Sequence, residues 1–212
     1  MPIPWLRESR GVVPTLAVPI SPISINPAIG LTIRILIVHR RKQLLVIGYG
    51  REICTPVAYE IAYRIGREIS RHDAILVTGG LGGVMEGASK GAKDVGGLVV
   101  GILPQDEASF GNDYLDVVIS TGIGYARNFI TAYSCDAIVI VGGGIGTLVE
   151  AGVAYMKRKP IVSMLGSGGV ADKFAGEYLD ERRLVRLEGE TDPAKAIEKA
   201  LSLANTRKTN SP

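Results

Sequence analysis

Two glycine-rich turns are the parts of this chain best suited to bind an anion. They read TGGLGG at residues 78–83 and GGGIGT at residues 142–147, and each lies between an apolar run and a helical pattern. The amino end of a helix offers unpaired N–H groups and partial positive charge, and glycine lets a backbone approach an anion closely. Because two such turns occur in one predicted sheet, a phosphate-binding site is favoured over the alternative that the glycines only permit tight turns between strand and helix. Its expected contacts are Gly48, Gly79, Gly80, Gly82, Gly83, Gly143, Gly144, Gly146, Asn128 and Thr147, the last through its hydroxyl group.

The common nucleotide-binding motifs do not fit these turns. A dinucleotide-binding protein has GxGxxG after its first strand and an acidic residue at the end of its second. Here Gly48-Tyr49-Gly50 is followed by Ile53 where the third glycine belongs, and the second apolar run ends in Thr78-Gly79. The sequence GxxxxGK[ST] does not occur. NAD binding is therefore disfavoured, and a P-loop NTPase is excluded.

Short apolar runs alternate with helical segments from residue 44 onward. Strands are expected at 44–48, 74–78, 98–103, 117–120, 137–141 and 161–165, with a short seventh at 185–187. Helices are expected at 55–70, 84–94, 125–134, from the second glycine-rich turn to about 157, and at 193–204. Continuous apolar strands separated by helices predict a doubly wound, mostly parallel α/β sheet of the Rossmann-like type. Both glycine-rich turns fall at the carboxyl ends of strands, where such sheets bind ligands.

The charge and the cysteine content narrow the class of protein. The chain has 24 Lys and Arg against 21 Asp and Glu, a net charge of +3 that is too small to predict a nucleic-acid or anionic membrane surface. Cys54 and Cys135 lie far apart without CxxC spacing, which argues against a disulfide framework or a zinc site. With His39 and His72 as the only histidines, we expect a cytoplasmic protein with no metal site and no resident cofactor.

The chain divides into three parts by composition. Residues 44–204 carry the Rossmann-like pattern, residues 205–212 form a polar tail, and residues 1–43 form an apolar extension that is uncharged from Gly11 to Ile33. Prolines at 14, 19, 22 and 27 would break a membrane-spanning helix, so no membrane segment is expected. The favoured interpretations of the extension are an arm packed on a partner or sequence upstream of the true start; a signal peptide is the less favoured alternative.

The second glycine-rich turn also carries a family resemblance. Residues 143–150, GGIGTLVE, resemble the GGxGTxxE core of the LONELY GUY phosphoribohydrolases, a family often mislabelled lysine decarboxylase. That family has Pro where Gly142 stands and an Arg fifteen residues earlier, which Arg127 matches, whereas Asn128 replaces the neighbouring Lys. The segments 78–104 and 126–162 look closer to a sister group of Rossmann-like proteins related to the Smf/DprA fold and the molybdenum cofactor carriers. The resemblance covers roughly residues 44–204.

The resemblance implies a small phosphorylated ligand and two alternative functions. One is hydrolysis of nucleoside 5′-monophosphates to base and ribose 5-phosphate, in which Glu150 would stabilise the oxocarbenium-like transition state or orient water, and Arg127 would contact the phosphate or the departing base. The other is a non-catalytic carrier or sensor of a phosphorylated cofactor. Structural roles as a helix-dipole carboxylate and a surface charge remain open for Glu150 and Arg127. We expect a homo-oligomer and no nucleic-acid partner. A lysine decarboxylase is rejected, because nothing in the sequence marks the Schiff-base lysine that a pyridoxal enzyme needs.

Overall fold

The computed structural model describes residues 40–207. The expectations for residues 1–39 and 208–212, which include the apolar extension and the end of the polar tail, lie outside the described residues.

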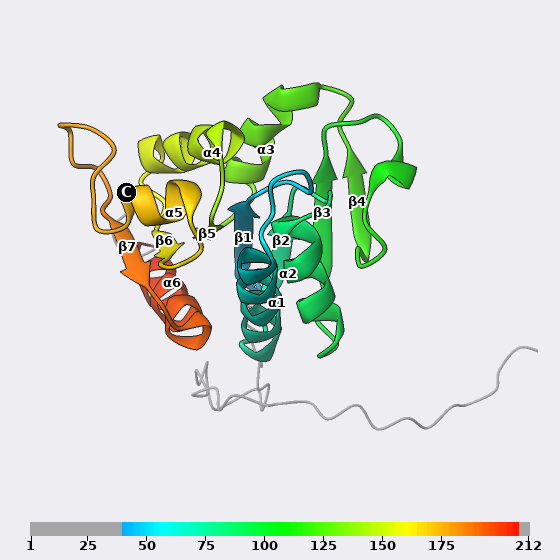
Figure 1. The fold of residues 1–212 in the computed structure, drawn as a ribbon, viewed down its shortest axis with the longest axis horizontal. Coiled ribbons are helices and arrows are strands. Elements are labelled where there is room, and N and C mark those ends of the chain that lie inside the picture. The colour runs from blue at the N-terminus through cyan, green and yellow to red at the C-terminus, as the bar shows by residue number, and fades with distance from the viewer. Residues whose placement is uncertain (1–39, 208–212) are drawn as a thin grey trace, which may run out of the picture. The chain divides into compact units, whose positions relative to one another are not determined.

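Seven parallel strands form one sheet in the order β4-β3-β2-β1-β5-β6-β7 (Figure 1). The strands are β1 (Gln43–Gly48), β2 (Ile75–Thr78), β3 (Val99–Leu103), β4 (Val117–Ser120), β5 (Ala137–Val141), β6 (Ile161–Met164) and β7 (Leu187–Glu190). The chain runs outward from β1 to β4 on one side and then from β5 to β7 on the other. This confirms the predicted doubly wound α/β sheet, and it is parallel throughout.

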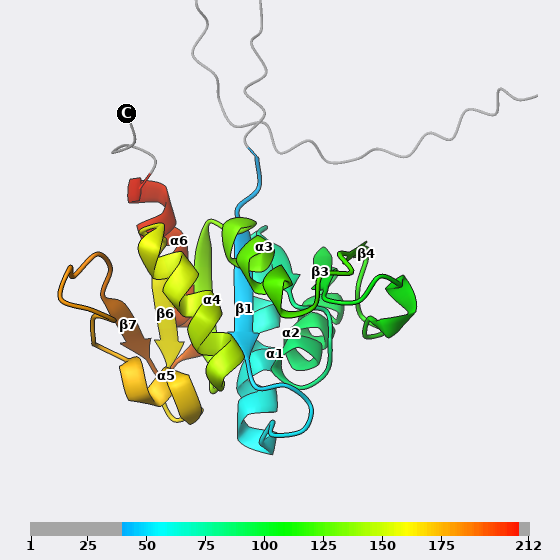
Figure 2. The same ribbon diagram turned by 90° about the horizontal axis from the view of Figure 1, so that it is seen from above.

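Helices cover both faces of the sheet (Figures 1 and 2). The α-helices are α1 (Pro56–Arg71), α2 (Val84–Lys93), α3 (Arg127–Tyr133), α4 (Ile145–Met156), α5 (Gly169–Phe174) and α6 (Pro193–Arg207), and short 3₁₀ turns lie at Ala108–Phe110 and Gly124–Ala126. One core layer joins Leu44 and Val46 to α1, α2 and α6. The other joins Leu45 and Ile47 to α4 and α5. Alternate residues of β1, whose four central residues are buried, thus pack into opposite layers, which explains its unbroken apolar run.

Local sequence explains how the helices begin. The Thr55 hydroxyl accepts a hydrogen bond from the N–H of Ala58 at 3.1 Å, and Pro56 occupies the first helical position of α1, where its missing N–H costs nothing. By contrast, α2 and α4 begin directly after the glycines of the two turns. The amino ends of both helices therefore lie at the carboxyl edge of the sheet.

Three elements differ from the sequence-based expectation. The helix expected at 125–134 begins as a 3₁₀ turn and becomes α-helical only at Arg127. The seventh strand lies at Leu187–Glu190 and not at 185–187. Helix α5 was not predicted, since its six residues are too few to show a helical period. Within residues 40–207, no helix is both long and apolar enough to cross a membrane.

Candidate ligand-binding site

The candidate site lies at the carboxyl edge of β1 and β5, where the order of the strands reverses. Open parallel sheets bind ligands at such a reversal because the connections on its two sides diverge and leave a crevice. Gly48 ends β1 opposite Val141, and a Cβ atom at Gly48 would lie only 2.0 Å from the carbonyl oxygen of Val141. A larger residue at position 48 would push the two strand ends apart, so glycine at this position allows β1 and β5 to stay paired at the base of the site.

The second glycine-rich turn presents the amino end of α4 to this edge. Gly142 and Gly143 have φ of +63° and +100°, values that glycine adopts readily. Their carbonyl oxygens accept hydrogen bonds from the N–H groups of Ala171 and Val170, at 3.0 Å each. Gly144 is the N-cap of α4, and no side chain of the described residues caps this helix. The carbonyl groups of the turn are thus used inside the protein, while the amino end of α4 is open to an anion.

The first glycine-rich turn is held by hydrogen bonds within the turn and from the side chain of Asn112. The N–H of Gly80 donates to the Thr78 hydroxyl at 3.1 Å, and the amide nitrogen of the Asn112 side chain donates to the carbonyl oxygens of Gly80 and Leu81 at 3.1 and 3.0 Å. Gly83 has φ of +74° and precedes the first residue of α2. These contacts hold the turn in one conformation, and the N–H of Val84, the first residue of α2, donates to the carbonyl oxygen of Tyr49 at 3.0 Å.

Arg127, at the start of α3, lies against the first turn. Its side chain is buried, and a Cβ atom at Gly79 would lie 2.2 Å from its Nη1 atom, so the guanidinium lies directly against the first turn. Among the described residues, no group accepts a hydrogen bond from its Nε–H. Burial lowers the pKa of Arg127, and the nearby charge of Glu150 opposes this effect. The molecule therefore holds a buried cation without a full set of partners.

Glu150 lies in the second turn of α4 and points inward. Its side chain is 8% exposed, and its Oε1 atom accepts a hydrogen bond from the Thr131 hydroxyl at 2.7 Å. Burial raises the pKa of Glu150 to about 6, against the opposing effects of the Thr131 hydrogen bond and the charge of Arg127. A carboxyl group that titrates near neutrality can exchange a proton with a bound molecule. No ion pair within 4.0 Å joins Glu150 to Arg127 in the described structure.

The structure brings most of the predicted residues to this edge. Asn128 is buried on α3, and its Nδ2 atom would lie 3.8 Å from a Cβ atom at Gly146. The Thr147 hydroxyl donates to the carbonyl oxygen of Gly48 at 3.0 Å and so ties α4 to β1. That hydrogen bond uses its proton inside the protein, and a contact of Thr147 with a ligand stays a prediction. A surface role for Arg127 and a simple dipole role for Glu150 do not fit their burial.

Sequence reasoning missed three residues of the site. Arg51 lies against Gly82 and pairs with Glu86 at 3.4 Å. The ring of Tyr49 lies beside Gly142, and Thr131 holds Glu150. Arg51 and Tyr49 directly follow the first strand, so their place at its carboxyl end was a signal available in the sequence. Thr131 had no such signal, because its role depends on the packing of α3 against α4.

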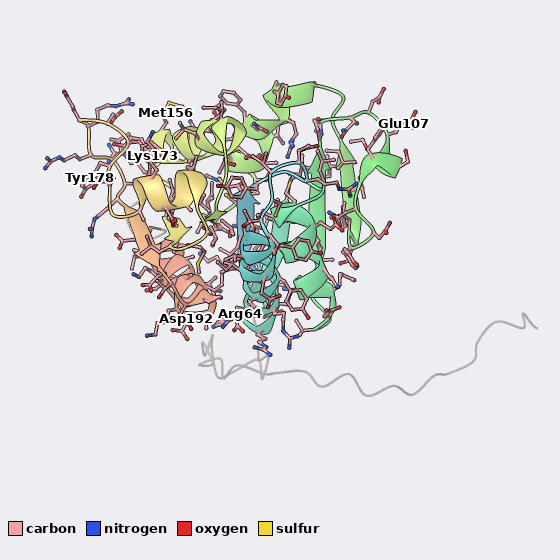
Figure 3. All side chains as sticks on the ribbon, viewed as in Figure 1. Arg64, Glu107, Met156, Lys173, Tyr178 and Asp192 are labelled. Atoms are coloured by element: carbon pink, nitrogen blue, oxygen red, sulfur yellow. The ribbon has the colours of Figure 1, made fainter. Side chains whose placement is uncertain are left out.

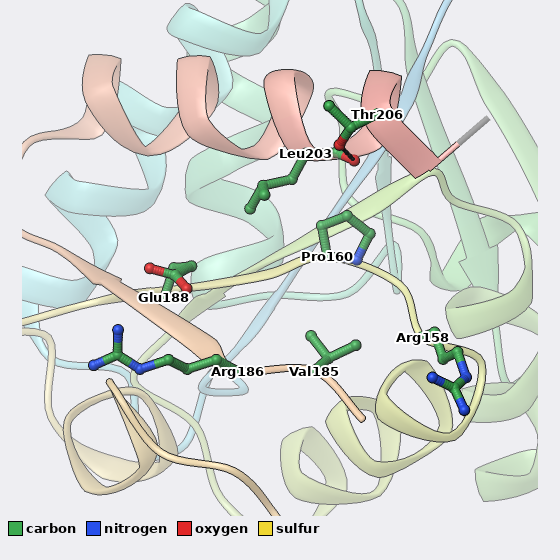
Figure 4. A pocket seen from close by; sticks show the side chains of 7 residues that line it. All are labelled: Arg158, Pro160, Val185, Arg186, Glu188, Leu203 and Thr206. Carbon is green, nitrogen blue, oxygen red and sulfur yellow. Dashed lines mark hydrogen bonds between the residues drawn. The ribbon is translucent and has the colours of Figure 1, made fainter. Parts of the chain in front are cut away.

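A separate hollow lies at the opposite edge of the sheet (Figure 4). It measures about 250 Å³ and is bounded by the amino ends of β6 and β7 and by α6. Its lining residues are Arg158, Pro160, Val185, Arg186, Glu188, Leu203 and Thr206. None of them belongs to the glycine-rich turns, so this hollow is distinct from the candidate site.

The fold is that of a Rossmann-like α/β protein, and the candidate site lies at the carboxyl edge of its sheet. A family model described as the SLOG cluster4 family matches residues 41–197, and the chain belongs to this family. The match includes every strand and both glycine-rich turns. It confirms the superfamily resemblance that the GGIGTLVE segment and the position of Arg127 predicted.

Three similar proteins place the family match in context. An uncharacterised protein of Archaeoglobus fulgidus is 47% identical over 122 residues, which are 58% of this chain and 79% of that protein. The molybdenum cofactor binding protein of Rippkaea orientalis is 34% identical, with a TM-score of 0.68 over 78% of this chain and 98% of the other. A structure of the Moco carrier protein of Chlamydomonas reinhardtii is 36% identical, with a TM-score of 0.68 over 79% of this chain and 99% of the other.

Proposed function

We propose that this protein binds a small phosphate-bearing ligand at the carboxyl edge of β1 and β5 and carries it. The observation that supports this most directly is the buried guanidinium of Arg127, whose Nε–H has no partner among the described residues. Burying an incompletely paired cation costs several kcal/mol, whereas a bound phosphate would accept charge-assisted hydrogen bonds from it. The amino end of α4 would donate to the same anion.

The similar structures favour a carrier function over other roles for such a site. Two of them are named as proteins that bind or carry the molybdenum cofactor. The alignment covers 98% and 99% of those two chains and 78% and 79% of this one. We infer that the molybdenum cofactor, or a phosphorylated cofactor like it, is the first cargo to test. In this function the protein holds its ligand without turnover, so Glu150 would position or neutralise the cargo and would not carry out chemistry.

A second candidate function is hydrolysis of nucleoside 5′-monophosphates. It is supported by Glu150, whose pKa near 6 leaves a fraction of the carboxyl protonated at neutral pH, and by its place on the helix that would hold the phosphate. In this function the carboxylate would stabilise positive charge that develops on the ribose as the glycosidic bond breaks. Arg127 would hold the phosphate or the departing base.

One set of samples distinguishes the two functions. The full chain, Arg127→Met and Glu150→Gln are purified from cells that make the molybdenum cofactor, and pterin fluorescence and molybdenum content are measured. The same samples are incubated with AMP, GMP, CMP and UMP and assayed for free base. Cofactor retained by the wild type and by Glu150→Gln, but lost in Arg127→Met, supports the carrier. Base release that Glu150→Gln abolishes supports the hydrolase, and neither result in the wild type refutes both.

Three further expectations from the sequence stay predictions. They are the cytoplasmic location, the homo-oligomer and the absence of a nucleic-acid partner. The low net charge remains the argument against nucleic acid, since about six to ten phosphate contacts are typical of such binding.

A further inference from the structure

An arginine side chain lies at each end of the first glycine-rich turn. A Cβ atom at Gly79 would lie 2.2 Å from the Nη1 atom of Arg127. At the other end, a Cβ atom at Gly82 would lie 2.5 Å from the Nε atom of Arg51. Neither Gly79 nor Gly82 has a positive φ, so the backbone conformation does not require glycine at these two positions. The close approach of the two arginine side chains explains why glycine stands there.

The two arginines are close enough to contact one small ligand. Three residues of extended chain span at most about 11 Å, so Gly79 and Gly82 are no further apart than this. Positive charges at the two ends of so short a turn repel each other, and anionic groups beside them relieve this repulsion. Arg127 is buried, and no described group accepts a hydrogen bond from its Nε–H. The turn thus joins a buried, incompletely paired cation to a second cation at the surface.

Arg51 is held loosely. Its guanidinium pairs with Glu86 at 3.4 Å, whereas the other four arginine–carboxylate pairs of the described residues have distances between 2.5 and 3.0 Å. Its side chain is 75% exposed. A guanidinium has five N–H donors, and the described residues accept one hydrogen bond from those of Arg51. Arg51 therefore has both the freedom and the donors to bind a further anionic group.

The amino end of α2 lies beside Arg51 and offers two more donors. Glu86, which pairs with Arg51, is the third residue of this helix. The N–H of Val84 donates to the carbonyl oxygen of Tyr49 at 3.0 Å. Within residues 40–207, however, no group accepts a hydrogen bond from the N–H groups of Met85 and Glu86. Unpaired N–H groups at the amino end of a helix bind anions readily. A cation and two backbone donors thus lie together at this end of the turn.

We propose that the ligand carries a second anionic group, which binds to Arg51 and the amino end of α2. Its phosphate group would bind to Arg127 and the amino end of α4, as in the proposed function, on which this inference rests. A diphosphate ester has the required form, because its two phosphate groups share one oxygen atom and can lie along the short turn. Both subsites belong to one edge of the sheet, since Arg51 follows β1 and the first glycine-rich turn follows β2.

Glu86 would compete with the second anionic group for Arg51. It is the carboxylate of the described residues that lies within 4.0 Å of the Arg51 guanidinium. The Oε2 atom of Glu52 lies instead beside Gly50, 3.2 Å from the position of a Cβ atom there. Figure 3 shows Glu107 on the loop that follows β3, at the side of the sheet where β4 lies. Glu86→Gln should therefore strengthen binding of the second group, because it removes a competing partner and a like charge.

The experiment is calorimetry of the full chain with inorganic phosphate and inorganic pyrophosphate, at one ionic strength and without divalent cations. The wild type should bind pyrophosphate at least about fivefold more tightly than phosphate, because a charge-assisted contact with Arg51 is added. Arg51→Met should fold, since this side chain is mostly exposed, and it should bind the two anions alike with the wild-type affinity for phosphate. The matched control is Arg71→Met, which removes an exposed arginine that pairs with Glu68 at the end of α1.

A preference for pyrophosphate that Arg51→Met removes, Arg71→Met preserves and Glu86→Gln increases supports the inference. A preference that Arg51→Met retains, or that Glu86→Gln lowers, overturns it, while phosphate binding by the wild type would leave the proposed function intact. Equal affinity of the wild type for the two anions overturns it in the same way. If the wild type binds neither anion, the proposed function fails and this inference fails with it. Circular dichroism checks that each variant is folded.

Discussion

Replacing Glu150 with Gln should remove a defined part of the pH dependence of stability. Burial holds the pKa of Glu150 at about 6 in the folded protein, above its usual 4.5. Between these two pH values the folded state binds more protons than the unfolded state, so the free energy of unfolding falls as the pH rises through this window. The gap between the two pKa values corresponds to about 2 kcal/mol. This stability is fully present below about pH 4.5 and is lost above about pH 6.

Urea unfolding of both proteins between about pH 4.5 and about pH 6.5 tests this prediction. The amide side chain of the Glu150→Gln variant retains a carbonyl oxygen that can accept from the Thr131 hydroxyl, so the replacement removes the titration and keeps the contact. The wild type should lose about 2 kcal/mol more than the variant across the window. Asp116, Asp136 and Asp192 have lowered pKa values, so they act below about pH 3.8 and not in this window. Parallel curves for the two proteins would refute a buried, titrating Glu150.

Three other substitutions test the site residue by residue. Gly144→Val should abolish phosphate binding measured by calorimetry while leaving the protein folded, because a Cβ atom there meets only one side-chain atom at 3.9 Å. Retained affinity would remove this turn from the site. Gly48→Ala should lower the free energy of unfolding by at least about 2 kcal/mol, because its Cβ atom would clash with a backbone carbonyl of β5. The control Gly50→Ala should change the free energy of unfolding little, and equal effects of the two substitutions would contradict the close approach of β1 to β5. Thr131→Val should raise the pKa of Glu150 further in an NMR titration, because a hydrogen bond to the charged form is lost, and an unchanged pKa would exclude that contact.

The sheet could be predicted because its central strands are buried on both faces. Runs such as AIVIV at residues 137–141 have no alternation to confuse with a surface strand, and the structure places that strand at the predicted residues. The two glycine-rich turns could be placed at the carboxyl edge for the same reason, since each follows such a run. Helix α5 gave no comparable signal, because six residues span less than two helical turns.

Residues of the candidate site could be proposed from the sequence, but their environment could not. Arg127 and Glu150 follow from a motif and its spacing, yet nothing in the sequence shows that both are buried or that Thr131 contacts Glu150. Those facts depend on how α3 packs against α4, and the sequence pattern of each helix alone does not show that the two helices are in contact.

The proposed function depends on a phosphate group binding to Arg127. Its most direct test is thermal unfolding of the full chain and of Arg127→Met in increasing inorganic phosphate, with chloride at matched ionic strength as the control. Phosphate should raise the midpoint of wild-type unfolding with the logarithm of its concentration once this exceeds the Kd, and it should leave the variant unchanged. Without phosphate, Arg127→Met should be at least as stable as the wild type, because a buried and incompletely paired charge is gone. An equal rise in both proteins would exclude Arg127 as the group that binds phosphate.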